Sequence, residues 1–234
     1  MKHGLPRFHV AKDLVRVHLR TLSFWASLFG GAMFALFYLW TDRRAGTPDD
    51  PFLSSYGTLV VPLVLVGCFT AILGKHSASA RALPYRLLGA SESEIALGEA
   101  LFVTAVCAFM GLLLVELGTF NTGVNEPRLA LGWIGALWGA SFGAYLSLAR
   151  RFPFRGAQWL LAFADYFVGT THGALSLFFP RAHFRSLLGG SPPLGLDQRL
   201  SSLSLVILVF VYLAMGLARS PRNSAVKPPL PNSQ

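Results

Sequence analysis

Charged side chains are scarce in this sequence. Only 13% of its 234 residues are Asp, Glu, Lys or Arg, and 53% are hydrophobic. A soluble domain usually carries about 25% charged residues, so this composition excludes an ordinary soluble protein. The sequence therefore predicts a protein embedded in a membrane.

Cysteine is almost absent as well. Cys68 and Cys107 are the only two, and both lie inside apolar runs. Two cysteines at that depth are expected to be small packing residues, which argues against a disulfide or a metal site. We predict no metal ion and no cofactor bound directly by this chain.

Acidic residues are the scarcer of the two charge types, with 11 Asp and Glu against 20 Lys and Arg. In a soluble protein such an excess of cations suggests that the protein binds nucleic acid. Here the cations gather beside apolar runs, a pattern that sets membrane topology. We therefore predict the lipid bilayer as a partner and no nucleic acid.

Long apolar runs make up most of the sequence. Each has close to the roughly 20 residues that a bilayer requires of a helix. The sequence predicts an all-α polytopic membrane protein whose transmembrane domain covers residues 22–218. Its six predicted transmembrane helices lie near 22–40, 57–74, 94–118, 129–149, 157–179 and 201–218.

The two ends of the chain differ in character from this domain. Residues 1–21 predict a basic amphipathic helix on the membrane surface, although an ordinary charged flank would have the same charges. Its cations are Arg7, Lys12, Arg16 and Arg20. Residues 219–234 are rich in proline and polar side chains and predict a disordered tail.

The linkers between the runs alternate in charge. Fourteen of the Lys and Arg residues lie in the N-terminus, residues 75–91, residues 150–155 and the tail, against six elsewhere. The positive-inside rule then places both termini and residues 75–91 in the cytoplasm. We expect a multi-pass protein of the inner (plasma) membrane.

Residues 75–91, which we call the elbow, join the second and third apolar runs. They predict a short amphipathic helix over 82–88, with Pro84 in its first turn and Gly89 as a left-handed C-cap. Ser91-Glu92-Ser93-Glu94 then has the pattern of a capping box that starts the next helix. We interpret the elbow as a docking surface for a soluble partner.

A stretch of small residues lies in the fourth run. Residues 139–143 read G-x-S-x-G, the serine-hydrolase pattern, but they lie where a helix must continue. Gly135, Gly139 and Gly143 are spaced by four, which favours close packing of helices. The alternative is a rhomboid-like intramembrane serine protease in which Ser141 pairs with His172.

Asp165 and His172 are the most deeply placed ionisable residues of the fifth run. Seven residues separate them, so both would project from one face of a continuous helix. They could line a substrate path, or form interhelical hydrogen bonds in which Asp165 reaches Arg155 or Gln158. Beyond this run, Arg181, His183 and Arg185 predict a basic patch in an outer loop.

Nucleotide chemistry is not expected of this chain. Residues 67–75 resemble a P-loop, yet six residues separate the glycines and His76 follows the lysine. The chain is therefore not predicted to be an enzyme, and any ATP and Mg would be bound by another protein.

Three stretches resemble a known family. They are residues 90–99, ASESEIALGE; residues 131–151, LGWIGALWGASFGAYLSLARR; and residues 183–190, HFRSLLGG, followed by Leu196-Asp197. They are similar to segments of the type-two family of ATP-binding-cassette (ABC) exporter permeases, in its gliding-motility-associated branch. One departure is Gly98-Glu99, where the family has G-K.

The resemblance implies a transport subunit. Its partners would be a cytoplasmic ABC ATPase that binds ATP and Mg, and a second permease, identical or different. It implies that the elbow helix at 81–89 is a coupling helix inserted into the ATPase. The residues expected to make that contact are Arg81, Leu83, Tyr85, Arg86, Leu87, Glu92 and Glu94. A membrane scaffold or assembly factor without transport is the remaining alternative.

Overall fold

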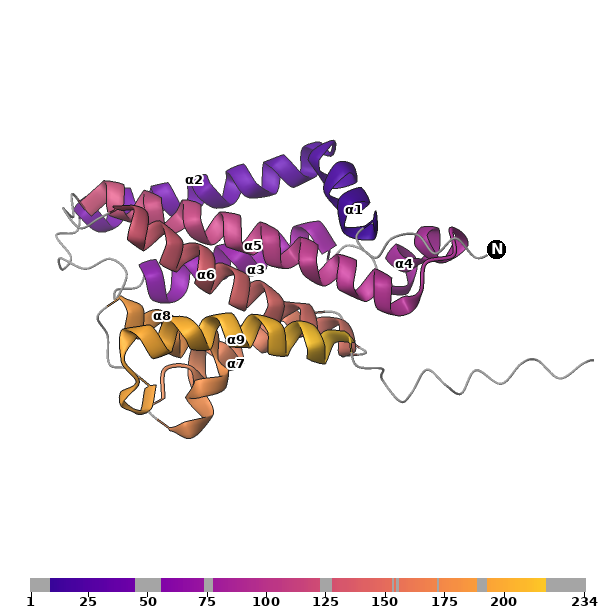
Figure 1. Ribbon diagram of the computed structural model, residues 1–234. Coiled ribbons are helices and arrows are strands. Elements are labelled where there is room, and N and C mark those ends of the chain that lie inside the picture. The colour runs from indigo at the N-terminus through magenta and orange to yellow at the C-terminus, as the bar shows by residue number, and fades with distance from the viewer. Residues whose placement is uncertain are drawn as a thin grey trace, which may run out of the picture.

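The computed structural model describes residues 9–44, 56–73, 78–122, 128–152, 154, 156–171, 173–188 and 193–217. Throughout these ranges the regular structure is helical (Figure 1). The α-helices are α1 His9–Leu19, α2 Leu22–Arg44, α3 Val61–Leu73, α4 Ala78–Leu87, α5 Glu92–Thr122, α6 Arg128–Ser147, α7 Ala157–Val168, α8 Pro180–Leu187 and α9 Gln198–Leu217. Short π or 3-10 turns are η1 Tyr56–Val60, η2 Leu148–Arg151, η3 Ala174–Phe178 and η4 Pro193–Gly195.

Four helical segments are long and apolar enough to cross a membrane. They are Phe24–Thr41, Glu92–Gly118, Leu131–Arg151 and Gln198–Leu217. The all-helical class and the multi-pass membrane character are thereby confirmed at this level. Six full-length spans are not established, since the second and fifth predicted runs form shorter helices.

The fifth run differs most from its prediction. A continuous helix over 157–179 is wrong, because α7 ends at Val168 after 12 residues. The hydroxyl of Thr170 donates to the carbonyl of Phe167 at 2.9 Å, and that of Thr171 donates to Val168 at 2.7 Å. These hydroxyls bond carbonyls at the end of the helix, where intrahelical partners are lacking. The chain then turns into η3 and α8.

Helices α5 and α6 pack side by side along the centre of the bundle (Figure 1). A Cβ added at Gly135 would lie 2.7 Å from Val115, and one added at Gly143 would lie 2.8 Å from the Cβ of Cys107. A Cβ at Gly139 would collide with the carbonyl oxygen of Cys107. Glycine at these positions lets the two helices approach at backbone distance.

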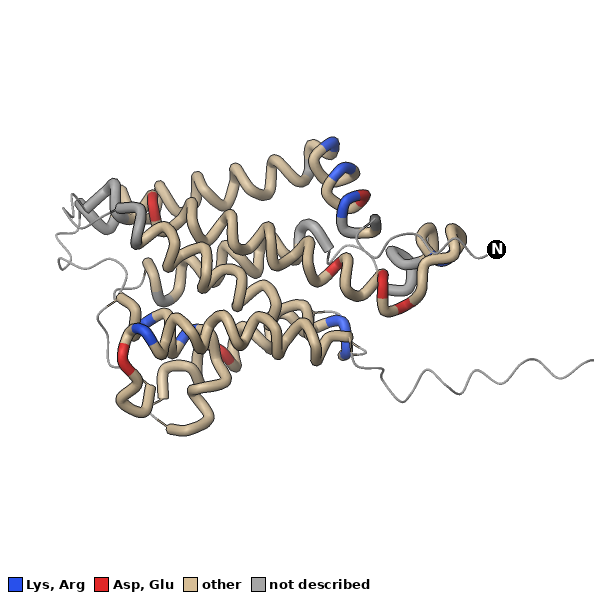
Figure 2. Tube along the Cα trace, in the orientation of Figure 1, with Lys and Arg blue, Asp and Glu red and all other residues tan. Residues whose placement is uncertain are grey.

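Basic residues lie at both ends of the bundle. Figure 2 shows those of α1 and η2 at one end, where α4 also lies, and those of α8 and the start of α9 at the other. The elbow, the N-terminal helix and the end of α6 therefore share one end of the molecule. Arg7, His172 and the predicted tail at 219–234 lie outside the described residues.

Candidate functional site

The elbow contains a helix, but a longer one than the sequence suggested. Helix α4 begins at Ala78, so Pro84 lies inside it and not in its first turn as predicted. Proline has no N–H to donate to the carbonyl four residues earlier, which weakens α4 at that point. The helix continues because its first six residues, ASARAL, contain no further proline or glycine and include three alanines.

Both caps of the elbow have the predicted form. Gly89 has φ +84°, the N–H of Gly89 donates to Arg86 at 2.9 Å, and the N–H of Ala90 donates to Tyr85 at 2.9 Å. These bonds make a Schellman motif, which ends α4 sharply. The capping box is also confirmed: the N–H of Ser91 donates to Glu94 at 2.7 Å, and the N–H of Glu94 donates to the Ser91 hydroxyl at 3.3 Å.

An apolar ridge stands on the outer side of the elbow. The side chains of Leu83, Leu87 and Leu88 are 54%, 79% and 68% exposed. Tyr85 points the other way and packs against the core. Burial raises the pKa of Tyr85, and the charges of Asp13 and Glu99 raise it further, so this ring lies near both α1 and α5. The elbow thus has one anchored side and one open side.

A chain of alternating charges connects the elbow to the bundle. Arg86 of α4 pairs with Glu92 at the start of α5, and Arg150 of η2 lies 3.9 Å from that same carboxylate. Arg150 also donates to Glu99 at 3.0 Å. The hydrogen bond and charge of Glu92 raise the pKa of Arg86. The chain links α4, α5 and the end of α6.

Glu99 lies two turns into α5 and is nearly inaccessible to solvent. Its side chain is 5% exposed, and that of Arg150 is 20% exposed. A carboxylate removed from water to that extent needs a cation within hydrogen-bond distance. Glu99 therefore fixes the end of α6 against the first turns of α5.

The N-terminal helix packs on the same end of the bundle. Val10 and Leu14 are each 5% exposed, and the ring of His18 lies 4.8 Å from that of Phe102 on α5. On the other face, Lys12, Arg16 and Arg20 are exposed. Within the predicted range 1–21, helix α1 covers His9–Leu19 and is amphipathic, with Val10 and Leu14 against the bundle and its cations outward.

Asp165 lies on α7, which ends at Val168, and its predicted neighbours His172 and Arg155 lie outside the described residues. Its carboxylate is 1% exposed and accepts the backbone N–H of Arg181 at 3.1 Å. Gln158 instead donates to Thr70 of α3 at 3.2 Å. The interhelical reading of Asp165 fits this geometry, with a partner that the sequence did not indicate.

The basic patch predicted at Arg181, His183 and Arg185 is not an exposed loop. These residues lie on α8, where Arg181 is 2% and His183 0% exposed. The guanidinium carbon of Arg181 lies 4.3 Å from the centre of the Tyr166 ring, a cation–π contact. Helix α8 has only eight residues and packs against both α7 and α9. The three basic residues alone could not indicate this burial, because it depends on contacts with those two helices.

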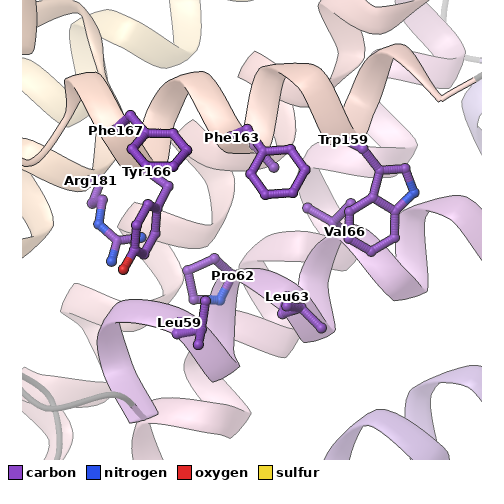
Figure 3. Close-up of a pocket in the computed structure, with 10 residues that line it drawn as sticks. Leu59, Pro62, Leu63, Val66, Trp159, Phe163, Tyr166, Phe167 and Arg181 are labelled. Atoms are coloured by element: carbon purple, nitrogen blue, oxygen red, sulfur yellow. The ribbon is translucent and has the colours of Figure 1, made fainter.

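A pocket of about 240 Å³ lies between α3 and α7 (Figure 3). Leu63 and Val66 form part of one wall, Trp159 and Phe163 form part of the other, and Arg181 stands at one end. Aliphatic and aromatic side chains account for nearly all of its lining. Sequence patterns do not indicate this pocket, because its two walls are about a hundred residues apart along the chain.

Ser141 lies within α6 and is 0% exposed. A serine nucleophile acts from an exposed turn, whereas here the helix runs on through Tyr145. The pairing of Ser141 with His172 stays a prediction, because His172 is not among the described residues. Within those residues, no group of three or more His, Cys, Asp or Glu side chains could hold a metal ion.

Comparison of the chain with known protein families, with curated proteins and with solved structures found no match.

Proposed function

We propose that this chain is the membrane permease subunit of an ABC transporter, driven by a separate cytoplasmic ATPase that docks on the elbow. The observation that carries the proposal is the exposed ridge of Leu83, Leu87 and Leu88 on a capped helix outside the bundle. Leu83 and Leu87 lie on the exposed side of the ten-residue helix α4 and Leu88 follows directly after it, which favours a protein partner that covers all three.

A coupling element must also pass a displacement on to the membrane helices. The alternating charges from Arg86 through Glu92 and Arg150 to Glu99 support that role, since they join α4 to two long helices. A push on the elbow would act on α5 and α6 together and change the path between two permeases. In this proposal, α1, the elbow and η2 face the cytoplasm and α3 and α7 complete six membrane segments.

The partner can be identified by crosslinking in cells. A Leu87→Cys variant, with the buried cysteines left in place, would be treated with a membrane-permeant thiol-to-amine crosslinker. The crosslinked chain would then be analysed by mass spectrometry. We expect an ATPase with a nucleotide-binding cassette, and no such adduct from Leu194→Cys, a matched exposed leucine on η4 that is 56% exposed. Recovery of only lipid-embedded or non-ATPase proteins at Leu87 would argue for the scaffold alternative.

Coupling is tested in proteoliposomes that contain this chain and the recovered ATPase. Leu83→Asp, Arg86→Asp and Leu87→Asp should each abolish the stimulation of ATP hydrolysis. A carboxylate at Leu83 or Leu87 must be desolvated on docking, and one at Arg86 loses the pair with Glu92 and repels it. Membrane insertion should be unchanged, and Leu194→Asp should keep full stimulation. Retention of coupled hydrolysis in all three elbow variants would rule out the role assigned to α4.

A further inference from the structure

The pocket between α3 and α7 takes no part in the coupling proposed for the elbow. Trp159, Phe163 and Phe167 of α7 are spaced by four, so they project in a row along one side of it. Leu63 of α3 faces this row (Figure 3). Such walls offer dispersion contacts and no row of hydrogen-bond donors, which matches a hydrocarbon chain.

The mouth of the pocket lies between apolar side chains. Phe163 is 58% exposed, Phe167 is 65% exposed and Leu63 is 45% exposed. In a bilayer, side chains with this exposure contact lipid tails. A chain could therefore enter from the hydrocarbon layer without crossing water.

One end of the pocket carries positive charge. Arg181 lines that end and is 2% exposed, with Tyr166 stacked beneath its guanidinium. The charged groups close enough to act on Arg181 include the carboxylate of Asp165 and the guanidinium of Arg185. Arg181 and Arg185 are cations and Asp165 is the one acid of these three groups, so they favour an anion at this end, where little water is present to screen them.

The size of the pocket limits its occupant. Pockets that enclose a drug-sized ligand measure roughly 300–1,000 Å³, and this one is smaller at about 240 Å³. It suits part of a single chain and excludes a whole phospholipid. The rest of such a molecule would stay in the surrounding bilayer.

We propose that the pocket holds one acyl chain of an anionic membrane phospholipid, with the lipid phosphate beside Arg181. This site goes beyond the coupling role of the elbow, because a lipid bound between α3 and α7 would stabilise their contact whether or not an ATPase docks. Asp165 is a positioning residue here, since it holds the backbone of Arg181 in place.

Native mass spectrometry of the full chain in a mild detergent tests the proposal. Delipidated protein would be mixed with phosphatidylglycerol or with phosphatidylcholine of identical acyl chains. We expect about tenfold higher occupancy by phosphatidylglycerol, the ratio that corresponds to one favourable charge contact of about 1.4 kcal/mol. Arg181→Gln should remove this preference. Ala162→Phe, which fills the pocket from α7, should lower the occupancy by phosphatidylglycerol about as much as the loss of the charge does.

Matched controls separate the site from lipid that adheres to the whole surface. Arg199→Gln removes an exposed cation and Ala214→Phe adds a ring to an exposed position, both on α9, and both should leave occupancy unchanged. Equal occupancy by the two lipids, or full retention of phosphatidylglycerol in Ala162→Phe, would overturn the proposal. Should Arg181→Gln fail to fold, the two-lipid comparison on the native chain still decides the headgroup.

Discussion

Oδ1 of Asp165 accepts the backbone N–H of Arg181 at 3.1 Å and thereby joins α7 to the first turn of α8. Phe179 occupies the N-cap of α8 and makes no side-chain cap bond, and Pro180 follows it. The first N–H groups of a helix need acceptors and favour negative charge. Asp165 therefore provides, from a different helix, the hydrogen-bond acceptor that a Ser or Asp at the N-cap would provide within the same helix.

Replacing Asp165 should therefore destabilise the protein in a graded way. Asp165→Leu leaves the N–H of Arg181 without this acceptor, at an expected cost of about 1–3 kcal/mol in the free energy of unfolding. Asp165→Asn keeps a carbonyl oxygen at that place and should cost less. Thermal unfolding of the purified chain in detergent measures both. An equal loss in the two variants would assign the effect to the charge of Asp165 and not to the hydrogen bond.

The contact between α5 and α6 predicts a sharp difference between two glycines. Gly139→Ala would place a methyl group against the carbonyl of Cys107, a backbone atom that cannot move aside cheaply, and should cost about 1–3 kcal/mol. Gly30→Ala on α2 meets nothing within 4 Å and should be neutral or stabilising by up to about 1 kcal/mol. Unfolding midpoints in one detergent compare them. A harmless Gly139→Ala would mean that the helices are farther apart than described.

The pair formed by Glu99 and Arg150 should show measurable coupling. A double-mutant cycle with Glu99→Ala and Arg150→Ala should give a coupling energy of about 1–3 kcal/mol, because Glu99 is nearly inaccessible to water. The same cycle on Arg86 and Glu92 is the control and should give a smaller value, since both of those side chains are about half exposed. Denaturant unfolding at two salt concentrations would measure both cycles. Similar coupling in the two pairs would show that burial adds nothing.

The features that the sequence predicted correctly are local ones. The capping box at Ser91 and Glu94 and the positive φ of Gly89 each depend on neighbours within about four residues. Four of the six apolar runs form helices long enough to cross a membrane. In a bilayer, a long apolar segment can form all of its backbone hydrogen bonds within itself only as a helix.

The features that the sequence did not predict depend on tertiary contacts. Hydropathy could not show that α7 ends at Val168, because the polar residues that follow are few and apolar residues resume after them. The tertiary contact that accompanies this helix end is visible only in the folded chain. A Cβ added at Gly169 would lie 3.0 Å from Arg181 and 3.3 Å from Phe179, so the start of α8 packs directly on the turn that follows α7. The sequence does not indicate the start of α4 at Ala78, because Pro84 is itself a strong signal for a helix start and lies six residues later.

Helix α7 has a consequence for the membrane beside it. Twelve residues make a helix about 18 Å long, whereas the hydrocarbon layer is about 30 Å thick. If α7 starts at the membrane surface, as in the proposed permease, the turn at Thr170 and Thr171 lies within the hydrocarbon layer, and its hydroxyls bond the carbonyls of Phe167 and Val168. In that arrangement the remaining backbone groups of the turn reach water only where the leaflet beside it thins, or they are covered by a second subunit. Either outcome makes this side of the molecule a place where the bilayer is locally deformed or replaced.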